Sequence, residues 1–258
     1  MIASSKMALS SRFPSLLPSS RRSRVAPMIR GLLVLAAMTS ALQAQEARLV
    51  NPRNPSTIDD FRALDVSREP YQRATDLVAA LQISPGDWVS DVGAGTGYYS
   101  TRLADSVGAE GRVFAEDIAI STWLNARLKA FNLHNVEVVK GEADDPKLPA
   151  DRLAAVLIVD SYHHFTNYPA MLDRILHALK PGGRLAIADY SSTEHRSLAR
   201  ADQLKLHEID PALVRAEVEQ AGFQVVRCDD PFVKWRPGVG NTRASATDLW
   251  LTIAIRPK

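Results

Sequence analysis

Short apolar runs alternate with longer amphipathic segments along most of the chain. Residues 153–160 form a continuous apolar run ending in an acid, which is typical of a central parallel strand buried on both faces. Leu172, Ile175 and Leu176 follow at helical spacing, after Pro169. Further strand-like runs cover residues 87–92, 112–118, 136–139, 184–190, 223–227 and 249–255. Strands that alternate with helices in this way predict an α/β fold with a largely parallel sheet.

The first strand runs into a loop with glycine at every second position, from Asp91 to Gly97. Glycine lets main-chain N–H groups approach a ligand closely, and the start of the following helix favours an anion. The spacing differs from a dinucleotide fingerprint, because Tyr98 stands where the third glycine would be required. Asp91 would repel a pyrophosphate and could attract an ammonium group. A ligand with an amino-acid end and a nucleoside end therefore suits this loop better than NAD.

The run Asp91-Val-Gly-Ala-Gly-Thr-Gly97 resembles the first motif of class I S-adenosylmethionine (SAM) dependent methyltransferases, of the type 11-like group. Later segments extend the resemblance from about Arg68 to Ile255, including Leu-Lys-Pro-Gly-Gly-Arg before the fifth strand. The resemblance implies a Rossmann-like sheet of seven strands, mostly parallel with an antiparallel edge strand, and helices on both faces. It also implies SAM as cofactor, held by Asp91 and by the loop residues Gly93, Ala94, Gly95 and Gly97.

Acids after the next two strands complete the expected cofactor site. Asp117 lies twenty positions beyond Gly97, where a carboxylate can accept hydrogen bonds from both ribose hydroxyls. The resemblance to Val-x-Ala-x-Asp favours Asp117 over Glu116, which we expect at a solvated strand end. By the same resemblance Glu142 and Ala143 match the adenine-binding position, and Asp144 remains an alternative.

The central strand ends in Asp160-Ser-Tyr162-His163-His164-Phe, at the sheet edge where open α/β folds place ligands. Asp160 is expected at the cofactor and Tyr162 at the substrate. His163 and His164 are candidate bases, because a histidine with a pKa near neutrality can accept a proton from an acidic acceptor. They could instead anchor the loop through hydrogen bonds. We expect no metal site, since adjacent histidines rarely point at one ion and no nearby acid pair completes a set.

The segment before the first strand tends to fold over the SAM site in related methyltransferases. Tyr71 and Gln72 are therefore candidate lid residues, with a packing role as the alternative.

These observations predict a SAM-dependent methyltransferase that acts on a small molecule, with O- or C-methylation favoured. The end of the central strand reads Asp160-Ser-Tyr-His and departs from the motif Asn/Asp-Pro-Pro-Tyr. This departure argues against methylation of nucleobase or glutamine amino groups. A SAM-binding module without turnover is the alternative. A nicotinamide oxidoreductase is disfavoured by the glycine spacing and by the lack of a Tyr-x-x-x-Lys pair.

Residues 1–44 differ from the rest in composition, with six basic residues and no acid. From Met28, a basic start, an apolar core at 31–42 and a small residue at Ala44 match a secretory signal peptide, and Met28 could be the true start. We expect residues 1–44 to be a leader, 45–66 a linker and 67–258 the methyltransferase domain. The predicted destination is the periplasm or the exterior; organellar import and anchoring by an uncleaved leader are alternatives.

Composition sets further limits on partners. Without the leader the net charge changes from +2 to −4, so the fold lacks the clustered basic charge that nucleic acids require. The single cysteine, Cys228, excludes an intrachain disulfide. We therefore expect a small-molecule substrate, and the sequence leaves the oligomeric state open.

Overall fold

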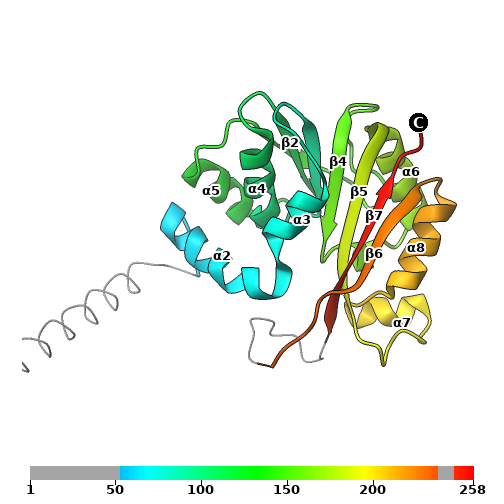
Figure 1. The fold of residues 1–258 in the computed structure, drawn as a ribbon. Coiled ribbons are helices and arrows are strands. Elements are labelled where there is room, and N and C mark those ends of the chain that lie inside the picture. Colours follow the sequence, from blue (N-terminus) through cyan, green and yellow to red (C-terminus); the bar gives the residue numbers. More distant parts are fainter. Residues whose placement is uncertain (1–52, 238–246) are drawn as a thin grey trace, which may run out of the picture. The chain divides into compact units, whose positions relative to one another are not determined.

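The computed structural model describes residues 53–237 and 247–258, so the predicted leader and the first part of the predicted linker, residues 45–52, lie outside the described residues. Seven strands form one sheet in the order β3-β2-β1-β4-β5-β7-β6 (Figure 1). The strands are β1 (Trp88–Val92), β2 (Arg112–Asp117), β3 (Val136–Lys140), β4 (Leu153–Val159), β5 (Leu179–Ser191), β6 (Gln224–Val233) and β7 (Asp248–Ile255). The pairs from β3 to β5 are parallel. This confirms the predicted fold class.

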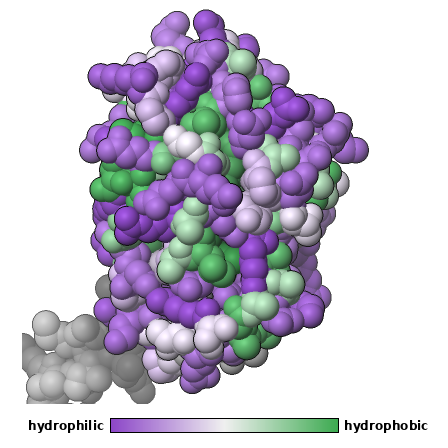
Figure 2. All heavy atoms as spheres, turned by 90° about the vertical axis from the view of Figure 1, so that its right-hand side faces the viewer, coloured by the Kyte–Doolittle hydropathy of each residue, from purple (hydrophilic) through white to green (hydrophobic). Residues whose placement is uncertain are grey.

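The reversed strand is β7, which pairs antiparallel with both β5 and β6. It therefore lies one place inside the edge, and β6 forms the edge itself. The side of the molecule that carries β6 and α8 (Pro211–Gln220) is mostly hydrophilic, with separate apolar patches (Figure 2). Arg227 and Asp229 of β6 form an exposed ion pair. Charges on an edge strand disfavour pairing with another sheet.

Helices cover both faces of the sheet because alternate strand residues point in opposite directions. On β4, Leu157 packs with α3 (Ala74–Ala80) and α4 (Tyr98–Val107), and Ile158 packs with α6 (Tyr168–Ala178) and α8. Both side chains are fully buried, as the continuous apolar run predicted. The remaining helices are α5 (Thr122–Ala130), α7 (Arg200–Lys205) and the short 3₁₀ turn η1 (Tyr162–His164). Within the described ranges, none of the helices has the length and apolar character needed to cross a bilayer.

A further helix, α2 (Ile58–Gln72), precedes the first strand. Thr57 caps its first turn: the Thr57 side chain accepts from the Asp60 N–H and the Asp60 carboxylate accepts from the Thr57 N–H. Phe61 is fully buried. The helix includes residues 58–66, which the sequence analysis assigned to the linker, so the ordered fold begins earlier than that boundary.

Candidate active site

The glycine loop joins β1 to α4 and is fixed to the end of β2. Gly93 and Ala94 donate their N–H groups to the Glu116 carbonyl oxygen at 2.9 and 2.8 Å. Gly93 has a φ of +77°, and a Cβ at this position would lie 2.3 Å from Ser161 Oγ. No larger residue fits without displacing Ser161.

Asp91 lies beneath this loop. Its side chain is 2% exposed, and Ser100 Oγ donates a hydrogen bond to it at 2.6 Å. Burial raises the pKa of Asp91 to about 6. The carboxyl group thus joins the end of β1 to the first turn of α4, and Asp91 is not one of the residues lining the cavity described next.

A cavity of about 470 Å³ opens beside the loop. Its walls come from the loop, the end of β2, the segment after β3, the segment after β4, and α6; they are Gly93, Glu116, Asp117, Ile118, Ala143, Ser161, His164, Phe165 and Met171. We call it the glycine-loop cavity. Its volume lies in the range of small-molecule and cofactor sites. Gly93, Asp117, Ala143 and His164, all predicted site residues, line this one cavity.

Asp117 and Glu116 occupy the end of β2 in different ways. Asp117 Oδ2 accepts a hydrogen bond from the Gly95 N–H at 2.9 Å, and Oδ1 accepts from the Ala119 N–H at 2.9 Å. Glu116 is 2% exposed, so the expectation of a solvated strand end is wrong. Burial raises the pKa of Glu116 to about 8, and Oε1 has no hydrogen-bond partner among the described residues. Glu116 also lines the cavity.

The segment after β3 contributes Ala143 to the cavity wall. The Glu142 side chain is 65% exposed and pairs with Lys147 at 3.3 Å. Asp144, the alternative, is exposed.

The segment after β4 separates residues that are adjacent in sequence. Asp160 adopts a left-handed conformation, with φ of +54°, and donates its N–H to the Ala188 carbonyl at 2.9 Å. Tyr162 turns into the core, is fully buried and donates to Glu217 Oε2 at 2.7 Å. Burial raises the pKa of Tyr162 far above its usual range. This position is inconsistent with the substrate contact expected for Tyr162.

His163 and His164 also differ in their surroundings. His163 is 1% exposed, and its Nδ1 lies 3.0 Å from both carboxylate oxygens of Asp189. His163 Nε2 lies 3.4 Å from Nδ1 of His207, which follows α7. His164 is exposed and lines the glycine-loop cavity. The anchoring alternative therefore describes His163, whereas His164 is the histidine that can reach a ligand.

Comparisons with known proteins agree with this architecture. A family model described as "Methyltransferase domain" matches residues 89–183. A "Ubiquinone/menaquinone biosynthesis C-methyltransferase UbiE" of Teredinibacter turnerae is 28% identical over 142 residues, which cover 54% of this chain and 57% of that protein. The chain thus matches little more than half the length of this relative. The crystal structure of a SAM-dependent methyltransferase from Aquifex aeolicus aligns with a TM-score of 0.59 and 21% identity, covering 82% of this chain and 97% of that one.

Residues 89–183 thus match a methyltransferase domain, and the comparisons support a class I SAM-dependent methyltransferase family. A further structure of this fold, the Haemonchus contortus phosphoethanolamine N-methyltransferase 2, was solved in complex with SAM; it aligns with a TM-score of 0.59 and 14% identity over 73% of this chain and 53% of that one. SAM is the cofactor of the family, and the residues present fit it. The loop leaves no room for a Cβ at Gly93, and the buried Glu116 Oε1 has no hydrogen-bond partner among the described residues.

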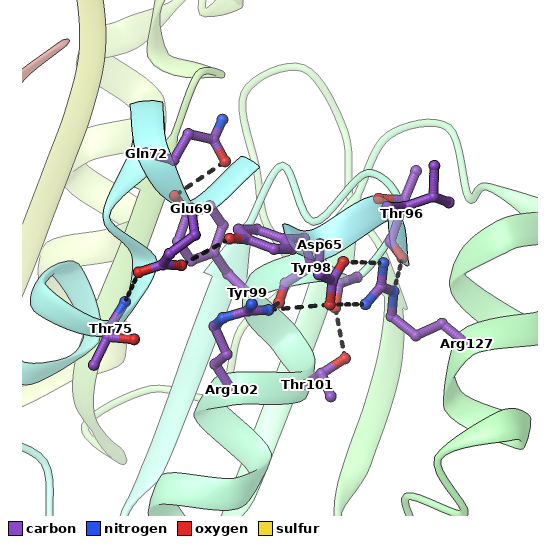
Figure 3. A network of polar contacts seen from close by, with 12 residues as sticks. Asp65, Glu69, Gln72, Thr75, Thr96, Tyr98, Tyr99, Thr101, Arg102 and Arg127 are labelled. Carbon is purple, nitrogen blue, oxygen red and sulfur yellow. Dashed lines mark hydrogen bonds and ion pairs between the residues drawn. The ribbon is translucent and has the colours of Figure 1, made fainter. Parts of the chain in front are cut away.

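In this fold, α2 is tied to the glycine loop by a polar network that the sequence analysis missed (Figure 3). Arg127 of α5 is 2% exposed and forms two hydrogen bonds of 2.9 Å with the Asp65 carboxylate. Its Nε donates to the Thr96 carbonyl of the loop at 2.9 Å. The helical spacing of α5 could have suggested a buried position for residue 127, but nothing local identifies its partner.

The two predicted lid residues at the end of α2 have separate environments. The Gln72 side chain is buried and accepts a hydrogen bond from the Tyr99 hydroxyl at 3.3 Å, which is the packing alternative (Figure 3). Tyr71 lines a second cavity of about 390 Å³, together with Tyr190, Phe232 and Trp235. We call it the α2 cavity. Burial raises the pKa of Tyr71, and the nearby Asp160 carboxylate acts in the same direction.

Proposed function

We propose that the chain catalyses methyl transfer from SAM to oxygen or carbon of a small molecule. The observation that carries the proposal is the glycine-loop cavity, where the loop, an acid at the end of β2 and a histidine after β4 share one space. SAM supplies a methyl group already activated by a positively charged sulfur. The protein therefore needs mainly to hold donor and acceptor in line and to exclude water.

In this proposal the cofactor contacts follow the walls of the cavity. Asp117 accepts hydrogen bonds from the ribose hydroxyls, and Glu142 with the Ala143 N–H holds the adenine edge. The main chain of the loop from Gly93 to Gly97, including Ala94, approaches the methionine portion, and the buried Asp91 joins β1 to α4 behind it. Asp160 would adjoin the transferred methyl group, because it lies between the glycine loop and the end of β5.

An acceptor hydroxyl or acidic carbon must lose a proton as its electron pair forms the new bond to the methyl carbon. The pair from the broken sulfur–carbon bond stays on sulfur. His164 is the proposed proton acceptor, because it is exposed and lines the cavity. His163 is the less suitable of the two predicted bases, since Asp189 and His207 already occupy its two nitrogens.

Two observations support an acceptor of the phenol or quinol type. Relatives such as the UbiE protein of Teredinibacter turnerae are named as C-methyltransferases of ubiquinone and menaquinone biosynthesis. The α2 cavity has aromatic walls, from Tyr71, Tyr190, Phe232 and Trp235, on which such a ring could pack.

Binding of S-adenosylhomocysteine, measured by titration calorimetry on the full chain, tests the cofactor part. We expect one equivalent to bind, and Asp117→Ala to weaken binding at least about tenfold, because a charge-assisted hydrogen bond contributes about 1.5–3 kcal/mol. Asp173→Ala is the matched control, since Asp173 lies on α6 with a side chain 59% exposed. No heat at saturating ligand would refute the proposal.

Transfer itself is tested with methyl-labelled SAM and a panel of phenols, catechols and quinols. We expect His164→Gln to lower kcat with little change in the affinity for S-adenosylhomocysteine. Binding without transfer to any acceptor would instead favour the second candidate, a SAM-binding module without turnover. That candidate is motivated by the predicted export signal, because SAM is made in the cytosol.

We also propose that the leader directs export to the periplasm or the exterior. Fractionation of cells, with the N-terminus of the mature chain sequenced, tests this proposal. A mature protein that begins after Ala44 outside the cytosol is the expected result. A cytosolic chain would refute it, and an organellar or membrane-bound chain would point to the alternative uses of the leader.

A further inference from the structure

Three of the six histidines in the sequence meet at one place. His163 and His164 come from η1, and His207 comes from the segment after α7, more than forty positions later. Their ring centroids are 4.0 Å apart for the adjacent pair, and 5.4 and 5.3 Å from each of these to His207. One nitrogen of each ring lies within 4.8 Å of a nitrogen of the other two. We call this group the histidine triad.

One pair of nitrogens in the triad already has the separation expected of two ligands of a shared ion. His163 Nε2 and His207 Nδ1 are 3.4 Å apart. Two nitrogens bound to one tetrahedral Zn²⁺, each at about 2.0–2.1 Å, are themselves separated by about 3.3–3.4 Å. His164 and His207 are exposed, so their side chains can rotate to bring the third nitrogen to the same distance.

The innermost histidine is already oriented as a metal ligand. The Asp189 carboxylate accepts a hydrogen bond from the His163 backbone N–H at 3.0 Å. Each of its two oxygens also lies 3.0 Å from His163 Nδ1. Asp189 is fully buried. A carboxylate on Nδ1 fixes the proton there and leaves Nε2 with its lone pair directed away, toward His207. This is the arrangement in which histidine most often binds zinc, with a carboxylate behind the ring.

We propose that the histidine triad binds one divalent transition-metal ion, of the kind that prefers imidazole, with Zn²⁺ as the representative. Three protein nitrogens leave a fourth position open, as in catalytic rather than structural zinc sites. His164 also lines the glycine-loop cavity, so the open position lies beside that cavity. This proposal departs from the expectation of no metal, which considered the adjacent histidines without His207.

The ion would deepen the proposed function, although its binding does not depend on that function. An acceptor hydroxyl on the open position would lose its proton more readily, because a divalent cation stabilises the oxyanion. His164 would then act as a ligand, and the proton would leave from the ion-bound hydroxyl to water. The same geometry without an ion is a hydrogen bond between two neutral imidazoles, which is the competing interpretation.

Zinc binding to the full chain, measured after treatment with a chelator, distinguishes the metal site from the hydrogen bond between imidazoles. The Cys228→Ser background removes the exposed thiol, which could bind zinc by itself. We expect one equivalent of Zn²⁺ by elemental analysis after desalting, and a dissociation constant that can be measured by competition with a chromophoric chelator. His207→Ala and His164→Ala should each weaken binding by about tenfold or more. His177→Ala is the matched control, because His177 is exposed and its Nδ1 contacts the Asp173 carbonyl of its own helix.

Asp189→Asn provides a second readout, with an expected loss of about 10–100-fold in zinc affinity, as for other groups that orient a ligand. Less than half an equivalent of zinc in the Cys228→Ser protein would overturn the proposal. Equal affinities in the His207→Ala and His177→Ala proteins would do the same. Titration of the same samples with S-adenosylhomocysteine keeps the two proposals apart: cofactor binding without zinc refutes only the metal site, and zinc without cofactor binding refutes only the proposed function.

Discussion

The buried pair between Asp65 and Arg127 should contribute strongly to stability. Arg127→Met keeps the aliphatic volume but removes two hydrogen bonds to Asp65 and one to the Thr96 carbonyl, each 2.9 Å long. It also removes the guanidinium 4.5 Å from the centre of the Phe61 ring. The Asp65 side chain is 12% exposed and would keep only the weaker contact with Arg102 at 3.4 Å.

Removal of one partner from a buried ion pair costs about 3–5 kcal/mol, because a charge remains without compensation. Since Arg102 remains near Asp65, we expect the lower end, about 3 kcal/mol. Asp65→Asn should cost less, and the double variant should be less destabilised than the sum of the two single variants by about 1–3 kcal/mol. Urea denaturation of all four proteins measures this coupling.

The exposed pair between Arg215 and Glu219 is the matched control. Its side chains are 57% and 45% exposed, so Arg215→Met should change the free energy of unfolding by less than about 0.5 kcal/mol. Because Arg127 also holds Thr96, the affinity for S-adenosylhomocysteine should fall in Arg127→Met and stay constant in Arg215→Met. A cost below about 1 kcal/mol for Arg127→Met, or additive effects in the cycle, would refute this account of how α2 is held.

Three further changes test other parts of the site. Gly93→Ala places a methyl group 2.3 Å from Ser161 Oγ at a φ of +77°. We expect the free energy of unfolding to fall by about 2 kcal/mol or more, and cofactor binding to weaken. A second change, Ser161→Gly, should recover only the part of this loss that is due to the clash, which urea denaturation can measure. Because the pKa of Glu116 is raised to about 8, the folded protein retains a proton that the unfolded chain releases above about 4.5. The free energy of unfolding should therefore fall as pH rises between these values, by up to about 1.4 kcal/mol per pH unit. Glu116→Gln should lack this part of the slope, and identical slopes in the two proteins would contradict the raised pKa of Glu116. Thr57→Ala removes the N-terminal cap of α2 and should lower the free energy of unfolding by about 1 kcal/mol. Amide hydrogen exchange in the first turn of α2 should become faster. Unchanged exchange would show that the cap does not hold the helix.

The sequence by itself determined where the strands lie along the chain and where the glycine loop joins strand to helix. Both depend on local properties, which are the period of apolar positions and the backbone freedom of glycine. The same reasoning found Asp117, because the carboxyl end of a parallel neighbour must lie beside the loop. It could have found Asp189 as well, since this acid also stands near the end of a parallel strand.

Tertiary structure decided which side chains around that loop face a ligand. Successive residues of a strand or tight turn point in different directions, so Tyr162 enters the core and His163 reaches Asp189, whereas His164 reaches the cavity. The partners that fix these directions, Glu217 and His207, lie more than forty positions away in the chain. Asp65 and Arg127 are likewise brought together by the packing of α2 against α5. Such contacts depend on how helices pack in space, and no local pattern of residues encodes that packing.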